Sequence, residues 1–394
     1  MQNLNEIQAT DIYNDSSCVS LVLVNGPESS VQGPRACAIF DSNPLIHFKK
    51  QGRFKSIIPA WKALQQFQNG TVYCIDLGFP QAAIAALGRR LKGKFRLIYE
   101  IGDPMRPLLS GQGKKGIELA MASWFDKYLP DQADALVFRG TYLHNYFQTL
   151  TPGHLLPPSL WLPDGVDIKG FHPLKDSKEV LGIRSKYNFN SKFVVGLVGS
   201  IHFAPKYQLF YGWELVEAIA HLPESSDIVG VIVGDGPGRP ILEQSIAEYG
   251  LENRIKLIGR VPHKEVPLWM NVFDVALSTQ TDDPVGWGRT TAKLPEYLAC
   301  GIPVICSDIG EAHRLLKSTG ETLSYSGIRD ESYPERLATK LLELKQKPDF
   351  LLECGKLNRK LAEEQFDFPL LKSKLKLFLN KLNAGELKPG DWLL

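Results

Sequence analysis

The residues of this chain best suited to chemistry lie together in residues 277–308, which read LSTQTDDPVGWGRTTAKLPEYLACGIPVICSD. A strand is expected to end at Leu277 and to open into a polar loop that contains glycine. A short helix is expected over TTAKLPEYLAC, and Gly301 ends it before the next strand. Strand, loop, helix and strand make one βαβ unit, in which ligands bind beyond the carboxyl ends of the strands, where a helix N-terminus points at them.

Four side chains at the start of this helix indicate what such a ligand would carry. Thr290 and Thr291 are expected to cap the helix. Lys293 and Glu296 are three residues apart, so they share a face one turn further on. A cation and a carboxylate above a helix N-terminus suit a ligand with phosphates and hydroxyls. The alternative is an ordinary surface ion pair, and the spacing alone favours that alternative.

Length and composition narrow the class of protein. At 394 residues the chain predicts two domains. A net charge of +2, from 45 basic and 43 acidic residues, argues against a nucleic-acid binder driven by bulk charge. Six cysteines without a CxxC pair indicate a reducing, cytoplasmic location. The first residues, MQNLNEIQATDIYNDSS, are too polar for a signal peptide, and no apolar run approaches the ~20 residues of a membrane span.

The first half alternates strands with helices, which predicts a parallel, doubly wound sheet. Residues 33–35, Gly-Pro-Arg, are expected in a loop after the first strand. The strand expected at 95–99 is followed by Glu100 and Asp103, and two carboxylates leaving a strand into a loop indicate a site. The alternative is that Asp103 caps a helix and that Glu100 is a solvated glutamate. The helix expected over 117–129 is amphipathic, a pattern typical of core packing.

A basic cluster ends the helix that precedes that strand. It carries five cations within eight residues: Arg89, Arg90, Lys92, Lys94 and Arg96. Most clusters of this kind are solvated surface, favoured by the helix dipole. The alternative is a surface that faces anionic lipid.

The second half repeats the alternation after a proline-rich segment at 151–167 and a charged, weakly apolar stretch. Its first strand is expected at 193–198, and Gly199-Ser200 begins the loop that follows. The loop at 234–238, Gly-Asp-Gly-Pro-Gly, lacks the full GxGxxG spacing, so we interpret it as a tight turn.

By residue 304 the chain resembles glycosyltransferases of the GT-B fold, and most of all glycosyltransferase family 4. The resemblance is specific over about residues 162–308 and mostly architectural before them. The matching pieces, in order, are LPDGVD at 162–167, VGLVG at 195–199 with Lys206, VGDGP at 233–237, IGRV at 258–261 and KLPEYLACGIPV at 293–304.

The resemblance implies an α/β fold of two facing Rossmann-like, doubly wound parallel-sheet domains with an interdomain cleft. The implied division is residues 1–170 as the acceptor-side domain, 171–191 as a linker, 192–365 as the nucleotide-sugar domain, and 366–394 as a helical segment that crosses back. The implied reaction moves a sugar from a UDP- or GDP-sugar to a glycan, lipid-linked or small-molecule acceptor. It retains the anomeric configuration, and it requires no metal and no cofactor beyond the donor.

The same resemblance gives roles to individual residues of the second domain. Lys206 would hold the diphosphate, and Thr290 and Thr291 would present amides or hydroxyls to the phosphates. Glu296 would accept hydrogen bonds from the ribose hydroxyls, since a carboxylate can accept two. Lys293 would pair with Glu296 and aim it.

The chain departs from the family pattern in the donor domain. Many relatives have an arginine after the glycine that corresponds to Gly199, where this chain has Ser200. Arg260 or Arg289 would then have to serve as the second cation beside Lys206. Gly288 stands where many relatives have the first of two glutamates.

The first domain departs as well. Relatives often have a histidine on the loop after the strand at 95–99, where this chain has Glu100 and Asp103. We therefore take these two carboxylates as the catalytic candidates and predict that Asp103 faces the sugar.

Two other classes of function stay open at this point. One is a catalytically degenerate GT-B protein that binds nucleotide or acts as a scaffold. The other is a second enzyme of similar architecture, such as a sugar-nucleotide epimerase or a phosphorylase. An NAD-dependent dehydrogenase is not favoured, because no complete glycine fingerprint follows the first strand. The expected location is cytoplasmic, with peripheral contact at the inner face of a membrane as a further hypothesis, and the oligomeric state is left open.

Overall fold

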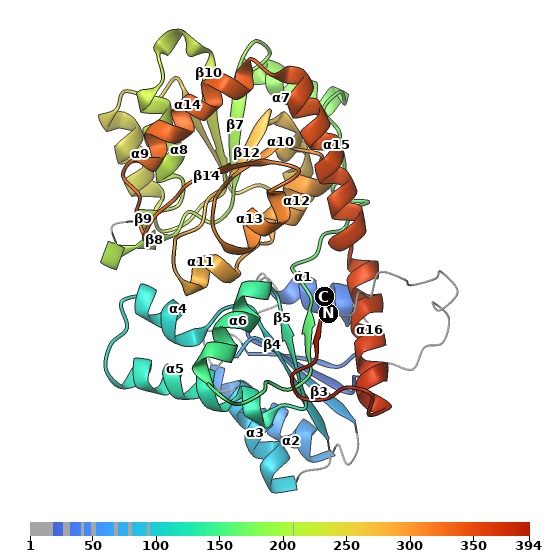
Figure 1. The fold of residues 1–394 in the computed structure, drawn as a ribbon. Coiled ribbons are helices and arrows are strands. Elements are labelled where there is room, and N and C mark those ends of the chain that lie inside the picture. Colours follow the sequence, from blue (N-terminus) through green and yellow to red (C-terminus); the bar gives the residue numbers. More distant parts are fainter. Residues whose placement is uncertain are drawn as a thin grey trace. The chain divides into compact units, whose positions relative to one another are not determined.

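The chain divides into two compact units, each built on one parallel sheet (Figure 1). Unit 1 comprises residues 1–110, 114–165 and 368–394, and unit 2 comprises residues 111–113 and 166–367. The computed structural model describes residues 19–26, 32–40, 43–48, 53–66, 70–77, 81–92, 95–207 and 209–394.

The segment expected as a linker, residues 171–191, lies in unit 2 and contains the helix α7 (Lys178–Lys186). Ser177 caps this helix, because its hydroxyl accepts a hydrogen bond from the nitrogen of Val180 at 3.2 Å. Arg184 of α7 donates to the backbone oxygen of Val272 at 2.5 Å, which ties the helix to the body of unit 2.

In the described part of unit 1, seven parallel strands form one sheet in the order β15-β6-β5-β4-β3-β1-β2. Its strands are continuous apolar runs because helices cover both faces of the sheet. In β1, Leu21 and Leu23 pack on one face while Val22 and Val24 pack on the other. The strands are β1 (Leu21–Val24), β2 (Leu45–His47), β3 (Thr71–Ile75), β4 (Arg96–Ile101), β5 (Ala135–Phe138), β6 (Ser159–Trp161) and β15 (Trp392–Leu393).

Two sets of helices cover this sheet (Figure 1). The helices α2, α3, α5 and α6 pack on one face, and α1 with α16 packs on the other. Residues 33–35 lie inside α1, so the loop expected there is wrong. A proline is tolerated in the first turn of a helix, where its missing N–H has no partner to lose. The helices are α1 (Gln32–Ile39), α2 (Ile57–Gln66), α3 (Gln81–Lys92), α4 (Met105–Gly111), α5 (Ile117–Tyr128), α6 (Thr141–Leu150) and α16 (Phe368–Asn383).

The apolar residues of α5 do not all enter the core, so the prediction of core packing along this helix is wrong in part. Phe125 and Ala122 are buried against the sheet. Met121 is 44% exposed and Trp124 is 53% exposed. The helix has apolar residues on two sides, and only one side meets the sheet.

The main sheet of unit 2, as far as its residues are described, has six parallel strands in the order β11-β10-β7-β12-β13-β14. The first strand of this unit, β7, therefore lies between the second and the fourth. The point where the strand order reverses, between β7 and β12, is where doubly wound sheets bind ligands. The strands are β7 (Phe193–Val198), β10 (Ile228–Val233), β11 (Ile255–Gly259), β12 (Val275–Ser278), β13 (Val304–Ser307) and β14 (Glu321–Leu323).

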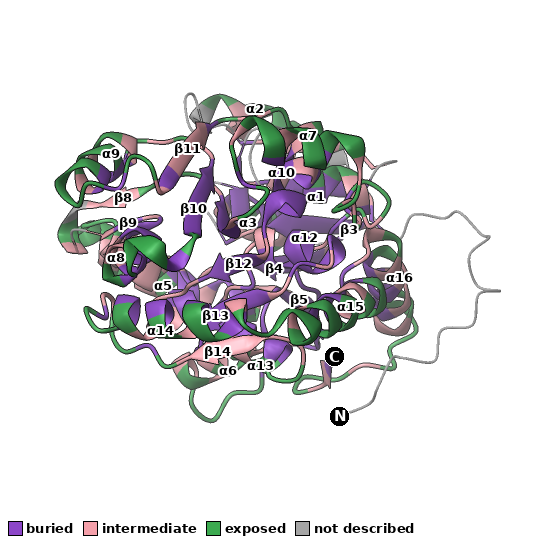
Figure 2. Ribbon diagram, turned by 90° about the horizontal axis from the view of Figure 1, so that it is seen from above, coloured by how far each residue is buried: buried purple, intermediate pink, exposed green. Residues whose placement is uncertain are grey.

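The central strands of both sheets are buried (Figure 2). In unit 2 the helices α8, α9 and α14 cover one face. On the other face the ring of Phe273 lies 2.1 Å from where a Cβ on Gly196 would be, so only glycine fits that position of β7. The helices are α8 (Trp213–His221), α9 (Arg239–Glu248), α10 (Val266–Val272), α11 (Pro284–Gly288), α12 (Lys293–Ala299), α13 (Gly310–Leu316), α14 (Tyr333–Lys345) and α15 (Pro348–Gln365).

Over the described ranges, none of these helices is both long enough and apolar enough to cross a membrane.

Candidate functional site

The start of α12 lies at the strand-order reversal of unit 2. This helix follows the loop after β12, and Tyr297 fastens it to the neighbouring strand. The hydroxyl of Tyr297 accepts a hydrogen bond from the backbone nitrogen of Val198, the last residue of β7, at 2.7 Å. The first turn of α12 is thereby held at the carboxyl ends of β7 and β12, where doubly wound sheets bind their ligands.

Lys293 and Glu296 form the ion pair that their spacing predicts. The Lys293 ammonium donates to Oε2 of Glu296 at 2.8 Å, and the two side chains are 29% and 10% exposed. A pair this deeply placed is less screened by water than a surface pair. The ammonium therefore fixes the direction in which the carboxylate points.

The expected capping role of Thr290 and Thr291 is wrong. The residue that begins α12 is Ala292, which makes no side-chain cap. Thr291 adopts a left-handed backbone conformation with φ of 52°, so the chain turns sharply before the helix starts. Thr290 is only 2% exposed, and within the described chain its Oγ1 makes no hydrogen bond. A buried hydroxyl without a partner is unusual in a folded protein.

The loop before α12, expected to be irregular, contains the short helix α11. Asp283 caps it, because its Oδ1 accepts from the nitrogen of Gly286 at 2.8 Å. The sequence signal for this helix was the pair Asp283-Pro284, a capping residue followed by proline at the first helical position. Gly288 ends α11 and is buried, and the half-buried Arg289 follows it directly.

The loops after β7 and β10 lie backbone against backbone. A Cβ on Gly234 would lie 1.7 Å from the carbonyl oxygen of Gly199, and one on Gly236 would lie 2.4 Å from that of Ile201. These glycines therefore serve the close packing of two loops. Ser200 is exposed on this loop, and its hydroxyl donates to the oxygen of Asp235 at 3.4 Å.

Lys206 lies further along the loop that follows β7. It occupies a turn between two short antiparallel strands, β8 (Phe203–Ala204) and β9 (Leu209–Phe210). Lys206 is exposed, and its ammonium donates to the hydroxyl of Tyr207 at 2.8 Å. Arg260 is also exposed and directly follows β11. Because the strands are parallel, both cations follow carboxyl ends at the same edge of the sheet as α12.

Glu100 lies inside β4 and not in the loop where it was expected. It is fully buried between two arginines, with Arg35 at 2.9 Å and Arg139 at 2.8 Å, and it accepts a hydrogen bond from the hydroxyl of Tyr73 at 2.8 Å. Burial by itself raises the pKa of Glu100, but the charges of Arg35 and Arg139 outweigh it and lower that pKa to about 2. Glu100 is therefore a fixed anion inside a buried network.

Asp76 is the residue of unit 1 that sequence reasoning missed. It follows β3, next to the point between β1 and β3 where the order of this sheet reverses. Its carboxylate lies 3.2 Å from Arg139 and accepts from Nε2 of Gln32 at 2.8 Å. Burial raises the pKa of Asp76, an effect that Arg139 opposes and that Glu100 and Asp103 increase. The half-buried Asp103 therefore belongs to the same cluster, and a polar residue directly after a buried strand was the available signal for Asp76.

Metal-ligating side chains and cysteines are two further kinds of group that could carry out chemistry in the parts of the chain that the structure describes. No three or more His, Cys, Asp or Glu side chains among those residues are placed to hold a metal ion. The described cysteines are all free thiols, with Cys37 exposed and Cys74, Cys300, Cys306 and Cys354 buried.

Comparison with known proteins matches the second unit to a family. Residues 212–363 match the family model described as Glycosyl transferases group 1. A 2-deoxystreptamine glucosyltransferase of Streptomyces kanamyceticus is 32% identical over 122 residues, which is 30% of this chain and 30% of that protein. The lipopolysaccharide core biosynthesis mannosyltransferase LpsB of Rhizobium meliloti is 27% identical over 179 residues, 43% of this chain and 46% of that protein. The matched segments thus span a third to a half of these relatives.

Comparison with solved structures covers both units. The crystal structure of Anabaena HepE in complex with UDP and glucose superposes with a TM-score of 0.71 at 16% identity, covering 92% of this chain and all of that one. The likeness at this identity is one of fold, and the expected GT-B fold is confirmed.

Proposed function

We propose that this chain, which has the GT-B fold and carries a group 1 glycosyl transferase domain, moves a sugar from a UDP- or GDP-sugar to an acceptor. The observation that carries the proposal is the start of α12. There the paired carboxylate of Glu296 and the buried, unpartnered hydroxyl of Thr290 lie at the strand-order reversal of unit 2. A carboxylate that accepts from a diol, next to a donor for phosphate, suits a nucleotide-diphosphate sugar.

The donor would bind along the carboxyl edge of the unit 2 sheet. Glu296, aimed by Lys293, would accept hydrogen bonds from the ribose hydroxyls. Thr290 would donate to a phosphate oxygen, and Lys206 would neutralise the diphosphate that departs when the glycosidic bond breaks. Fixed cations and donors that face a departing anion stabilise the transition state without a metal. Arg260 or Arg289 would supply the second cation that Ser200 does not provide.

Unit 1 would position the sugar and its acceptor. Asp103, beside Asp76 at the strand-order reversal of this sheet, is the side chain that we propose to face the transferred sugar. Glu100 would not touch the sugar itself. It would position Arg35 and Arg139, the two arginines with which it forms ion pairs. The class of acceptor stays open among glycan, lipid-linked and small-molecule compounds, and we expect retention of anomeric configuration from the family resemblance.

The test is a thermal-unfolding screen of the whole chain against nucleoside diphosphates and their sugars. A ligand that binds only the folded chain raises the unfolding midpoint. At a ligand concentration of a hundred times its Kd, the free energy of unfolding increases by about 2.7 kcal/mol. We expect UDP or GDP to raise it, and donor hydrolysis or transfer to follow with the matching sugar. No shift with any nucleoside diphosphate or nucleotide sugar contradicts the proposal.

Two variants and one control test which residues bind the donor. Glu296→Gln and Lys206→Ala should each weaken donor binding by about ten-fold or more, since hydrogen bonds to charged groups contribute about 1.5–3 kcal/mol. Lys356→Ala, which removes an exposed lysine on α15, should leave binding unchanged. Product analysis separates the alternatives, because an epimerase returns an isomerised donor and a degenerate binding protein returns none. No structural observation favours either alternative.

A further inference from the structure

The outer surface of unit 1 carries apolar side chains that the fold leaves in solvent. Three residues of α5 follow a helical spacing and form one stripe, with Ile117 at 76%, Met121 at 44% and Trp124 at 53% exposed. On the neighbouring helix α3, Leu87 is 49% and Leu91 is 64% exposed. Contiguous apolar side chains on a surface mark a site of interaction with a partner or a membrane. We call the exposed sides of these two helices the α3–α5 face.

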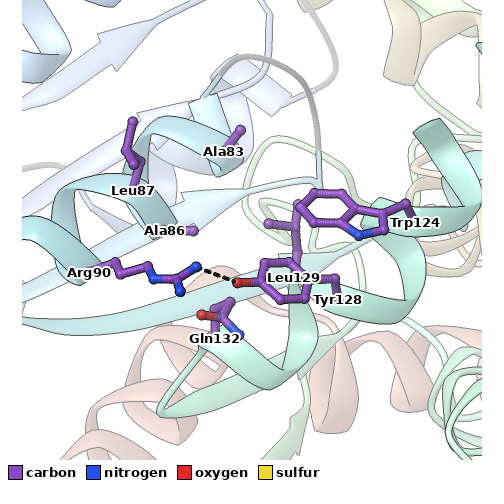
Figure 3. A pocket seen from close by; sticks show the side chains of 8 residues that line it. All are labelled: Ala83, Ala86, Leu87, Arg90, Trp124, Tyr128, Leu129 and Gln132. Atoms are coloured by element: carbon purple, nitrogen blue, oxygen red, sulfur yellow. Dashed lines mark hydrogen bonds between the residues drawn. The ribbon is translucent and has the colours of Figure 1, made fainter.

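A pocket of about 220 Å³ lies in this face. Ala83, Leu87 and Arg90 of α3 line one side of it, and Trp124, Tyr128 and Gln132 line the other (Figure 3). The rings of Trp124 and Tyr128 stack with their centroids 4.4 Å apart, and Arg90 donates to the Tyr128 hydroxyl at 3.4 Å. Indole and phenol side chains of this kind favour the boundary between apolar and wet surroundings.

Basic side chains lie beside the apolar ones. Arg90 of α3 lines the pocket. Lys115 and Lys127 are exposed at either end of α5. Four acidic side chains belong to the same region: Asp126 is buried, Asp134 pairs with Arg89, Glu118 pairs with Lys114, and Asp131 is exposed. The unpaired charge of the face is therefore mainly positive.

The α3–α5 face is separate from the candidate site of the same unit. Arg89, next to the pocket residue Arg90, pairs with Asp134 and donates to the oxygen of Gln132, just before β5 begins. The pocket thus lies by the amino end of β5. Asp76 and Asp103 follow the carboxyl ends of β3 and β4, at the opposite edge of the sheet.

We propose that the α3–α5 face binds the surface of an anionic lipid membrane. Leu87 and Leu91 would enter the boundary of the acyl chains, and Trp124 would lie at the level of the headgroups. Lys115 and Lys127 would approach the lipid phosphates while their stems cover apolar surface. Positive charge around an apolar stripe favours this occupant over an apolar protein helix, which would leave those cations without counter-charges. Attachment would be peripheral.

The test is co-sedimentation of the full chain with vesicles, at about 0.1 M and 0.5 M salt. One set is pure phosphatidylcholine and the other contains about one third phosphatidylserine. We expect binding to the anionic vesicles that weakens as salt screens the charges. Leu87→Gln with Leu91→Gln should lower the partition coefficient roughly ten-fold or more, and Lys115→Gln with Lys127→Gln should lower it by a comparable factor.

The control replaces an equally exposed leucine elsewhere. Leu352 on α15 is 62% exposed, and Leu352→Gln should bind vesicles as the parent does. All these side chains are exposed, so thermal midpoints should not change, and nucleotide binding should stay as in the parent. The proposal is overturned if the parent does not bind anionic vesicles, or if the leucine pair binds as the parent does. It is equally overturned if the leucine pair alters only self-association in size-exclusion chromatography, which would assign the face to a second copy of the chain.

Discussion

The hydroxyl of Tyr297 lies 2.7 Å from the backbone nitrogen of Val198 and accepts its hydrogen bond. Val198 ends β7 and Tyr297 follows Glu296 on α12, so this one contact joins the first strand of unit 2 to the helix that carries the candidate carboxylate. Both residues are buried. The position of Glu296 over the strand ends therefore depends on the side chain that follows it in the helix.

Replacing Tyr297 with phenylalanine should destabilise unit 2 and weaken donor binding together. The change leaves the buried N–H of Val198 without an acceptor, which costs about 1–3 kcal/mol. Urea unfolding measures the loss in free energy of unfolding, provided that the dependence on urea concentration is the same in variant and parent. Titration with nucleotide measures the weaker donor binding. Tyr249→Phe, at a tyrosine that is 51% exposed, is the matched control and should change neither. An unchanged free energy of unfolding in Tyr297→Phe would mean that the hydrogen bond contributes nothing.

Replacing Thr290 with valine should separate binding from stability. The hydroxyl is buried and makes no hydrogen bond in the described chain, so removing it should change the free energy of unfolding by less than about 1 kcal/mol or increase it. If the hydroxyl meets a phosphate, affinity for the nucleoside diphosphate should fall roughly ten-fold. Calorimetric titration and urea unfolding of the same preparation check both. Equal affinity in the variant and the parent would remove Thr290 from the donor site.

Glu214 should make the stability of unit 2 depend on pH. This residue of α8 is 7% exposed, and burial raises its pKa to about 7, although hydrogen bonds from the backbone and Thr279 oppose the rise. The folded chain then holds the proton more tightly than the unfolded chain, whose glutamate has a pKa near 4.3. The stabilisation is complete below about pH 4 and is lost as pH rises toward about 7.

Glu214→Gln should remove this pH dependence. Near pH 8 the variant should be more stable than the parent by up to about 3 kcal/mol, because the parent has to ionise a buried carboxyl. Urea unfolding between pH 4 and 8 compares the two. Parallel stability curves over that range would show that Glu214 does not titrate there.

Glu100→Gln should strongly destabilise unit 1. The change leaves Arg35 and Arg139 buried with less compensating charge, and breaking a buried pair in this way costs about 3–5 kcal/mol. In the parent the pKa of Glu100 is lowered to about 2, so its contribution is present above about pH 4.5 and disappears as pH falls toward 2. Glu353→Gln, at an exposed pair with Lys356, should cost less than about 1 kcal/mol. A loss at Glu100 as small as that of the control would contradict the buried network.

The sequence alone determined the features that depend on local pattern. Alternating apolar strands and helices predicted two doubly wound parallel sheets, because such sheets are apolar on both faces. The three-residue spacing of Lys293 and Glu296 predicted their ion pair, since helical neighbours three apart share a face. The block from Lys293 to Val304 pointed to the family, and its match to the group 1 model confirms that resemblance.

Only the tertiary structure decided which side chains are buried and what they meet. Glu100 and Asp103 look alike in sequence, yet one is enclosed by arginines that lie 65 and 39 residues away in the chain. The threonines before α12 look like caps, but a left-handed turn at Thr291 takes Thr290 inside without a partner. Trp124 has the spacing of a core residue, but one helix can turn only one of its two apolar sides to the sheet. Local pattern specifies which elements form, whereas burial and charge partners depend on contacts between segments far apart in the sequence.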